Sequence, residues 1–510
     1  MKKRFLVLVL CLAAIYQVSF PQLSRQDLKK IDDIVSGAYT RFGTTGISVA
    51  VVYDTVIIYN KAFGYADASN SRLATTSSLF NIASCSKAFT AACVSILVDE
   101  GKIRLTDKVR DYIPEFRLQD DYISREMTIE DLLCHRSGLG TFFGDLLWYN
   151  TTYDNSDIIR RMQFLPITRR FGIEYGYQNN MFMVAGEIIR KVTGKSWEEF
   201  LTERILNPLS MVQTRPAPDM ITSGQDVAYG HINGETLPLY NFRATRPAAS
   251  MYSNTSELTR WAMMMINSGS LKGVRILSPA AVNKIMTPAI TLGVSQTQRQ
   301  RETNFNSYGL GWFIYDHKGT RIVHHDGGMP GYISKVLLVP DKKYAVIILN
   351  NGNDGYVNEA VKGDILDILL KGTDWDWTGE YLAARDRSVA ASKRADEARA
   401  SSRVTGTTPS LPLKDYSGLF RDRMYGDAEV KTDGDKLTLT LLPASEVFTG
   451  TLEHWHYNTF KVVFRDKFLT YGLVTFSFNS SGIVEGFKID LPSADFHFWN
   501  LDFKKVTTNR

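Results

Sequence analysis

The sequence is poor in cysteine. Four occur in 510 residues, and one of them, Cys11, lies in the apolar N-terminal segment. Two of the other three, Cys85 and Cys93, are eight residues apart on one expected helix, about 12 Å along its axis. That separation is too long for a disulfide, and Cys134 then has no partner. A disulfide framework is therefore excluded, and all three thiols are expected to be small buried groups.

Charge of one sign is also lacking. The chain has 59 Lys and Arg against 54 Asp and Glu, a net charge of +5. So small an excess in a chain of this length gives no reason to expect a nucleic acid partner.

Several hydrolase motifs are missing. Neither His-Glu-x-x-His nor His-x-His-x-Asp-His occurs, which argues against a metallohydrolase. His454 and His456 could face one side of a strand, but no third ligand lies near them, so no metal and no organic cofactor is expected. Gly-x-Ser-x-Gly is absent as well, which argues against an α/β-hydrolase.

Long apolar runs are confined to the N-terminus. Lys2, Lys3 and Arg4 precede an apolar run from Phe5 to Tyr16, the pattern of a secretory signal in residues 1–20. The run is too short to favour a spanning helix, although a retained anchor is the alternative. We therefore expect a periplasmic or secreted protein with no transmembrane segment after signal cleavage.

A serine stands three residues before a lysine in Ser84-Cys85-Ser86-Lys87, at the start of an apolar, Ala-rich run. On a helix this spacing places the hydroxyl and the amine on one face. Burial of the lysine would lower its pKa, so that it could take the serine proton. The alternative is an N-cap serine with a lysine that reaches solvent.

Two further motifs favour catalysis. Tyr177-Gln178-Asn179 precedes a clear helix, and His325-Asp326-Gly327 lies at the start of a strand-like segment. Ser-x-x-Lys, Tyr-x-Asn and His-x-Gly in this order resemble the serine β-lactamase and penicillin-binding-protein superfamily. The chain is most similar to its class C β-lactamase-related group, which includes esterases, DD-peptidases and D-aminopeptidases. The resemblance covers roughly residues 30 to 370.

The resemblance implies a role for each matching residue. Ser84 would be the nucleophile, and Lys87 and Tyr177 would move its proton, with the identity of the base left open. Asn179 would bind Lys87 and the substrate amide. His325, Gly327 and Gly328 would line the substrate and oxyanion site, with backbone N–H groups of Ser84 and Gly328 as the oxyanion hole.

The expected fold class is α/β (α+β). The resemblance implies a mostly antiparallel sheet flanked by helices, with a helical subdomain that contains Tyr177, in residues 21–378. Residues 379–412 are polar and rich in Ala, Arg and Lys, which predicts a helical linker. Short alternating strands in residues 413–510 predict a small all-β barrel that folds separately and resembles a lipocalin-like domain.

Three functions remain open. The first is a secreted serine hydrolase that cleaves an amide or ester bond in a small molecule or short peptide, which could contain D-residues. The second is a true class C-like β-lactamase, and the third is a non-catalytic binding relative. His325 stands where classical β-lactamases have lysine, and Asp326 follows it. The carboxylate of Asp326 is expected to repel the carboxylate of a β-lactam and so to weaken its turnover.

Overall fold

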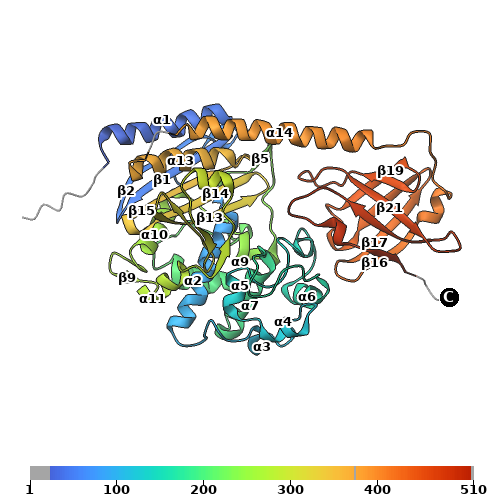
Figure 1. Cartoon of the computed structure of the whole chain (residues 1–510), viewed down its shortest axis with the longest axis horizontal. Helices are drawn as coiled ribbons and strands as arrows, with labels where there is room; N and C mark the ends of the chain where they lie inside the picture. The colour runs from blue at the N-terminus through green and yellow to red at the C-terminus, as the bar shows by residue number, and fades with distance from the viewer. Residues whose placement is uncertain (1–22, 373–374, 507–510) are drawn as a thin grey trace, which may run out of the picture.

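The computed structural model describes residues 23–372 and 375–506, which form a large α/β body and a closed β-barrel (Figure 1). The predicted fold class is confirmed. The predicted signal segment, residues 1–20, lies outside the described residues. Within the described ranges, no helix combines the length and the apolar character needed to cross a membrane.

The α/β body is built on an antiparallel sheet with the strand order β10-β11-β12-β13-β14-β15-β1-β2-β3. Its central strands β1 and β15 are buried along almost their whole length, because helices cover both faces. The strands are β1 Gly46–Tyr53, β2 Val56–Asp67, β3 Arg72–Leu73, β10 Ile290–Leu292, β11 Asn306–Tyr308, β12 Phe313–His317, β13 Thr320–Met329, β14 Tyr332–Val339 and β15 Tyr344–Asn350.

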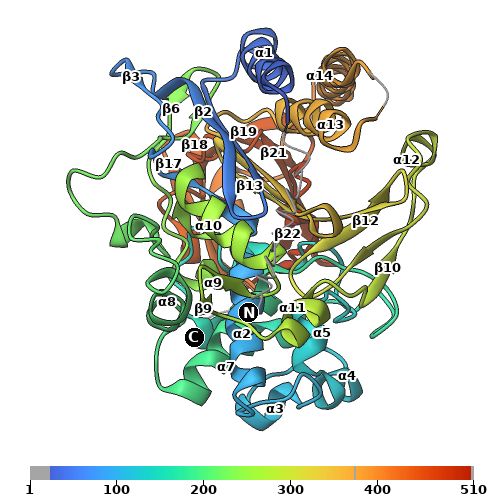
Figure 2. The same cartoon turned by 90° about the vertical axis from the view of Figure 1, so that its left-hand side faces the viewer.

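One face of the sheet is covered by α1 (Arg25–Phe42), α13 (Tyr356–Leu370) and the start of α14 (Trp377–Ser401), which lie side by side in Figure 2. A capping box between Ser24 and Asp27 begins α1, and its apolar face packs on the central strands. Burying this face joins the first and last segments of the α/β body in one core.

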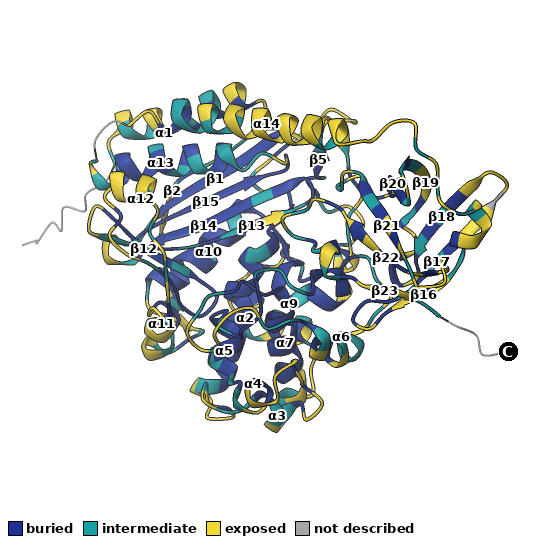
Figure 3. Cartoon of the chain, turned by 45° about the vertical axis from the view of Figure 1, so that its right-hand side comes forward, coloured by how far each residue is buried: buried dark blue, intermediate teal, exposed yellow. Residues whose placement is uncertain are grey.

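The other face carries most of the remaining helices. Among them α2 (Ser86–Asp99) is buried from Ser86 to Leu97, so it forms the centre of this layer (Figure 3). The others are α3 Val109–Tyr112, α4 Asp121–Glu126, α5 Ile129–Leu133, α6 Asn155–Arg161, α7 Asn179–Thr193, α8 Trp197–Leu201, α9 Arg246–Ala249, α10 Thr255–Ile266 and α11 Pro279–Ile285. Short strands pair between them: β4 Phe80–Asn81 with β7 Tyr252–Ser253, β5 His231–Ile232 with β6 Glu235–Thr236, and β8 Ser270–Leu271 with β9 Val274–Arg275. The short helix α12, Gln296–Gln300, lies instead beside α14, where the following Arg301 binds Glu380.

The C-terminal strands close into a barrel because β23 pairs with β16 as well as with β22. Alternation along each strand points aromatic rings into the interior and polar residues outward. The strands are β16 Gly418–Asp422, β17 Gly426–Asp433, β18 Lys436–Leu441, β19 Thr449–His456, β20 Thr459–Val462, β21 Gly472–Phe478, β22 Val484–Asp490 and β23 Phe503–Lys505. Buried rings of the barrel include those of Tyr416, just before β16, and of Phe420, Phe460, Phe476, Phe487 and Phe503.

Helix α14 connects the two parts. Its first turn packs on α13, where Trp377 covers Gly363 and its indole donates to the Asp367 carboxylate over 2.7 Å. The rest of the helix is largely exposed (Figure 3). The helix thus begins two residues before the predicted linker of residues 379–412, and its first residues belong to the packing of the α/β body.

The barrel also touches the α/β body directly. The Tyr149 hydroxyl donates to the Asp466 carboxylate over 2.9 Å, and the Thr152 amide donates to the Pro443 carbonyl over 2.9 Å. The Tyr149 ring lies 4.2 Å from that of Phe496, centroid to centroid. Apolar packing is therefore continuous from the helical layer into the barrel, a contact that the sequence pattern did not predict.

Candidate active site

Ser84 lies on a short 3₁₀ turn, Ala83–Cys85, between strand β4 and helix α2. Ala83 has φ +45°, a conformation that costs a residue with a side chain roughly 1–3 kcal/mol. The Asn81 side chain compensates by accepting a hydrogen bond from the Ala83 amide over 2.7 Å. This turn places the Ser84 hydroxyl in a cleft at the start of α2.

Lys87 lies directly behind Ser84 and has no solvent exposure. Its Nζ is 3.1 Å from Ser84 Oγ and donates to Asn179 Oδ1 over 2.6 Å. A third bond, of 3.0 Å, reaches the Ala248 carbonyl. Burial lowers the pKa of Lys87 to about 7. The free amine is therefore accessible at neutral pH, and it can accept a proton from Ser84.

Asp145 extends this chain of hydrogen bonds. The Asn179 amide donates to Asp145 Oδ2 over 2.7 Å, so Asn179 bridges the lysine and a buried carboxyl. Burial raises the pKa of Asp145 to about 7. Sequence reasoning missed Asp145, which begins a short 3₁₀ helix, Asp145–Leu147, and reaches the site only through the tertiary fold.

Tyr177 lies on the opposite side of Ser84, just before α7. Ser84 and Tyr177 both line the cleft, and the Lys87 Nζ lies 4.7 Å from the Tyr177 ring centroid. Burial raises the pKa of Tyr177 above its ordinary value, so the side chain keeps its O–H proton at neutral pH. A phenol in this position can donate a proton toward a group bound at Ser84.

His325 faces the same cleft from strand β13. Its Nε2 lies 3.0 Å from the Tyr308 hydroxyl, and its Nδ1 lies 2.6 Å from the Asp326 carbonyl. Burial, and next the charge of Lys87, lowers the pKa of His325 to about 3. The imidazole is thus neutral at pH 7 and supplies no fixed positive charge to the cleft.

The two glycines of this strand differ in their surroundings. A Cβ at Gly327 would lie 2.2 Å from the Ile82 carbonyl oxygen and from Ser334 Oγ, whereas a Cβ at Gly328 would meet its nearest neighbour at 4.0 Å. Gly327 therefore lets β13 pack against the turn that carries Ser84, and Gly328 lines the open cleft. Strand β12 pairs with β13 only as far as His324. Strand β14, on the other side, pairs with β13 as far as Met329.

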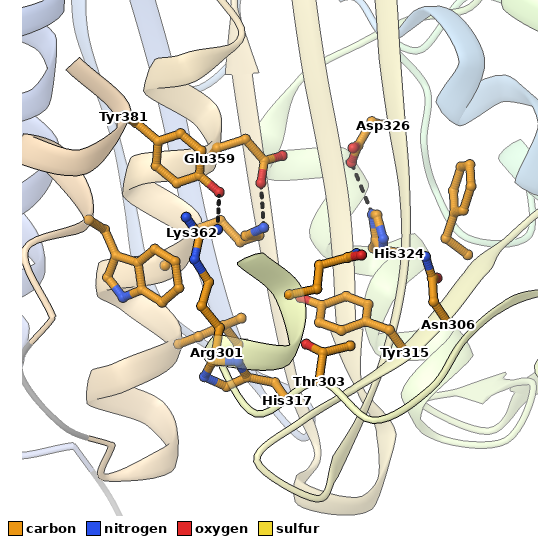
Figure 4. Close-up of a pocket in the computed structure, with 15 residues that line it drawn as sticks. Arg301, Thr303, Asn306, Tyr315, His317, His324, Asp326, Glu359, Lys362 and Tyr381 are labelled. Atoms are coloured by element: carbon orange, nitrogen blue, oxygen red, sulfur yellow. Dashed lines mark hydrogen bonds and ion pairs between the residues drawn. The ribbon is translucent and has the colours of Figure 1, made fainter. Parts of the chain in front are cut away.

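Asp326 corrects one expectation. Its carboxylate contacts Lys335 Nζ and lies 3.1 Å from His324 Nδ1, at a second cavity of about 290 Å³ behind the sheet (Figure 4). Lys335 also binds Glu359 over 2.8 Å. Burial would raise the pKa of Asp326, but Lys335, and next His324, hold it well below its usual range. The premise of an unpaired Asp326 charge acting on bound carboxylates is therefore wrong.

Cys85, the neighbour of Ser84, is not a competing nucleophile. Burial raises the pKa of its thiol to about 12, and its Sγ lies 3.2 Å from the His325 carbonyl oxygen. It is therefore a neutral thiol at pH 7. All three described cysteines are buried and free, as the sequence predicts.

The cleft itself has a volume of about 640 Å³. Of the predicted site residues, Ser84, Tyr177, Asn179, His325 and Gly328 line it. Lys87 contacts Ser84 from behind, and Gly327 packs against the turn that carries Ser84. Three barrel residues also line the cleft, and no sequence signal indicated them: Phe468, Asp495 and Phe496. Among the described residues, no group of three or more His, Cys, Asp or Glu side chains could hold a metal ion.

The antiparallel sheet and its helical layers are those of a β-lactamase/transpeptidase-like hydrolase fold. The family model described as Beta-lactamase matches residues 31–369, and the chain belongs to this family. A second model, described as a domain of unknown function (DUF3471), matches residues 402–505, the region of the barrel. The family predicted from the three motifs, and the appended all-β barrel, are thus confirmed.

Two curated proteins are similar to this chain. The chain is 27% identical over 453 residues to "Unguisins hydrolase ungD'" of Aspergillus campestris (strain IBT 28561), with 82% of each chain covered. It is 27% identical over 346 residues to "Protein flp" of Staphylococcus aureus (strain MW2), with 67% of this chain and 66% of that protein covered.

Two solved structures share the fold. One is the octameric penicillin-binding protein homologue from Pyrococcus abyssi, with a TM-score of 0.60, 22% identity, and 94% of this chain and 100% of that chain covered. The other is described as SurE with D-Leu, with a TM-score of 0.55, 16% identity, and 95% and 100% covered.

Proposed function

We propose that this protein is a serine hydrolase that cleaves amide or ester bonds through an acyl-enzyme on Ser84. The observation that carries the proposal is the buried Lys87, whose Nζ lies 3.1 Å from Ser84 Oγ and whose pKa is lowered to about 7. A lysine in this state is a base at neutral pH, which an N-cap serine and a solvent-exposed lysine would not provide.

The reaction proceeds in two halves. Ser84 Oγ attacks the substrate carbonyl carbon and its proton passes to Lys87 Nζ. The backbone N–H groups of Ser84 and Gly328 stabilise the oxyanion. The C–N or C–O bond then breaks, and the leaving group takes a proton from the Tyr177 hydroxyl, which Lys87 restores. Water attacks the ester carbonyl in the second half and releases the acid and Ser84.

The proposed substrates are short peptides, amides or esters, with D-residues included. The cleft of about 640 Å³ has room for a small molecule or a short peptide. The neutral His325 supplies no cation for a substrate carboxylate, which supports weak turnover of β-lactams even though Asp326 is charge-compensated. The intact Ser84, Lys87 and Tyr177 cluster, together with a relative named as a hydrolase, supports catalysis rather than binding alone.

We also propose that residues 1–20 are a signal that directs the protein to the periplasm or the exterior. The support is the basic start and the apolar run that follows it. Mass spectrometry of the protein recovered from periplasm and medium tests this, because an uncleaved N-terminus or an exclusively cytoplasmic protein contradicts it.

The decisive experiment combines covalent labelling with turnover. The full-length protein is treated with a fluorophosphonate and assayed with p-nitrophenyl esters, D- and L-aminoacyl anilides and a chromogenic cephalosporin. We expect labelling at Ser84 and hydrolysis of esters or anilides, both lost in Ser84→Ala and unchanged in Cys85→Ala. Ser77→Ala, at an exposed serine, is the matched control. A wild-type protein that neither labels nor hydrolyses any substrate would overturn the proposal.

A further inference from the structure

Two loops of the barrel reach the cleft that holds Ser84. The loop between β20 and β21 supplies Phe468, and the loop between β22 and β23 supplies Asp495 and Phe496. Residues far apart in the chain thus share one cavity, with the serine–lysine pair on one side and the barrel loops on another.

These loops are held in place by specific contacts. Asp466 Oδ1 accepts hydrogen bonds from the amides of Phe468 over 2.8 Å and Leu469 over 3.1 Å, and its Oδ2 accepts from the Tyr149 hydroxyl. The Phe496 ring packs against those of Tyr149 and Trp148, at centroid distances of 4.2 and 6.0 Å. The barrel wall of the cleft is therefore fixed to the same helical layer that holds Asp145.

The acidic side chains that line the cleft are not matched by basic ones among its described lining residues. Among the described residues that line it, the charged side chains are Asp145, Asp326 and Asp495, with no lysine or arginine. Asp326 is compensated by Lys335, and Asp145 is bound by Asn179. The side-chain oxygens of Asp495 receive no hydrogen bond or ion pair from the described residues, although the side chain is partly buried and burial raises its pKa.

A partly buried carboxylate without a partner is costly unless something else compensates it. Two rings of the barrel loops, Phe468 and Phe496, line the cleft together with Asp495. The Asp145 carboxyl is also close enough to interact with Asp495. Aromatic faces and a second carboxyl both favour a cation in this part of the cleft. The chemistry that completes this site is therefore a positively charged group on an otherwise apolar ligand.

We propose that the barrel forms one wall of the substrate site and that Asp495 binds an ammonium group of the substrate. The inference rests on the proposed hydrolase function and deepens it, because it names a substrate class. The barrel then selects substrates, while Ser84, Lys87 and Tyr177 carry out the chemistry.

Matched substrate pairs test this directly. Alanyl and lactoyl p-nitroanilides, in both enantiomers, differ by an ammonium in place of a hydroxyl. Nα-acetyl-lysine and Nα-acetyl-norleucine p-nitroanilides provide the same comparison at a longer reach. We expect the wild type to prefer the charged member of at least one pair, and Asp495→Asn to reduce that preference by roughly 10-fold or more, mainly through KM.

The controls separate substrate selection from chemistry. Asp495→Glu should keep the preference for the charged member, and Asp435→Asn, at an exposed aspartate in the β17–β18 turn, should not change it. Fluorophosphonate labelling of Ser84 should be equal in all variants. A preference for the charged member that survives Asp495→Asn, or no preference in the wild type for either pair, refutes the inference while normal labelling leaves the hydrolase intact. A wild type without labelling and without turnover refutes the proposed function itself.

Discussion

Asp145→Asn should move the acidic limb of the pH profile to lower pH. The Asp145 carboxylate favours the protonated form of Lys87, because opposite charges attract through the Asn179 bridge. Removal of this charge lowers the pKa of Lys87 further. Lys87 is a base only when it is deprotonated. Activity that rises with pH through about 7 in the wild type should therefore begin to rise at a lower pH in the variant.

The magnitude follows from the geometry. Hydrogen bonds of 2.6 and 2.7 Å join Lys87 and Asp145 through one amide. The two charges thus lie roughly 6–7 Å apart, and at an effective dielectric constant of ~20 they interact by about 2.5 kcal/mol, or nearly 2 pKa units. Because burial raises the pKa of Asp145 to about 7, only part of its charge is present near neutrality. The expected shift is therefore roughly one pH unit.

The assay is kcat/KM for a neutral p-nitrophenyl ester between pH 5 and 9, since this quantity reports the free enzyme. Asparagine preserves the shape of the side chain and can still accept from the Asn179 amide. Asp435→Asn, remote and exposed, serves as the control. A limb that stays in place, or moves to higher pH, would show that Lys87 is not the group whose deprotonation starts the reaction.

Further predictions concern the supporting contacts. Lys87→Ala and Tyr177→Phe should each lower kcat by about 10²-fold or more, and the double variant should lose far less than the product, because the two groups act as a unit; additive losses would contradict this. Lys335→Met leaves the Asp326 carboxylate without its lysine, whereas Glu359 keeps its ion pair with Lys362, and should lower the free energy of unfolding by about 3 kcal/mol in urea titrations. Lys393→Met, at an exposed lysine, should change it little. Tyr149→Phe removes the hydrogen bond to Asp466 and should alter the ratio of charged to neutral substrate turnover without affecting Ser84 labelling; an unchanged ratio would mean that this bond does not position the barrel loops.

The sequence was sufficient to predict the residues nearest to Ser84. Ser84 and Lys87 are three residues apart at the start of one helix, so local periodicity alone brings them together. Asp145 could not be found in this way. It lies on a short 3₁₀ helix far from Ser84 in the sequence, and its bond to Asn179 exists only because the fold packs that helix beside α7.

The pairing of Asp326 was predictable but overlooked. Pro330 and Gly331 form a two-residue connection between β13 and β14, which fixes the register of the hairpin. Counting outward from that turn places Asp326 directly opposite Lys335. The sequence thus contained the compensating charge, four residue pairs from a recognisable turn.

The strands of the barrel could be predicted from the sequence, but its contact with the cleft could not. Alternating apolar residues and the turn around Gly434 predicted its strands, since these signals are local. Which loops would meet the cleft depends on how two separately patterned regions pack, and no periodicity encodes that contact. Phe468, Asp495 and Phe496 could therefore be assigned to the site only in the folded chain.

Helix α14 makes the contact between barrel and cleft an intramolecular one. Its 25 residues span roughly 37 Å and keep the barrel close to the cleft at all times. A free barrel with millimolar affinity would dissociate at assay concentrations, whereas a tether supplies an effective concentration of about that size. A binding free energy of only about 4 kcal/mol between the barrel and the α/β body is then enough to keep them in contact about half of the time. Substitutions that would separate two independent proteins should appear here as a change in which substrates are accepted.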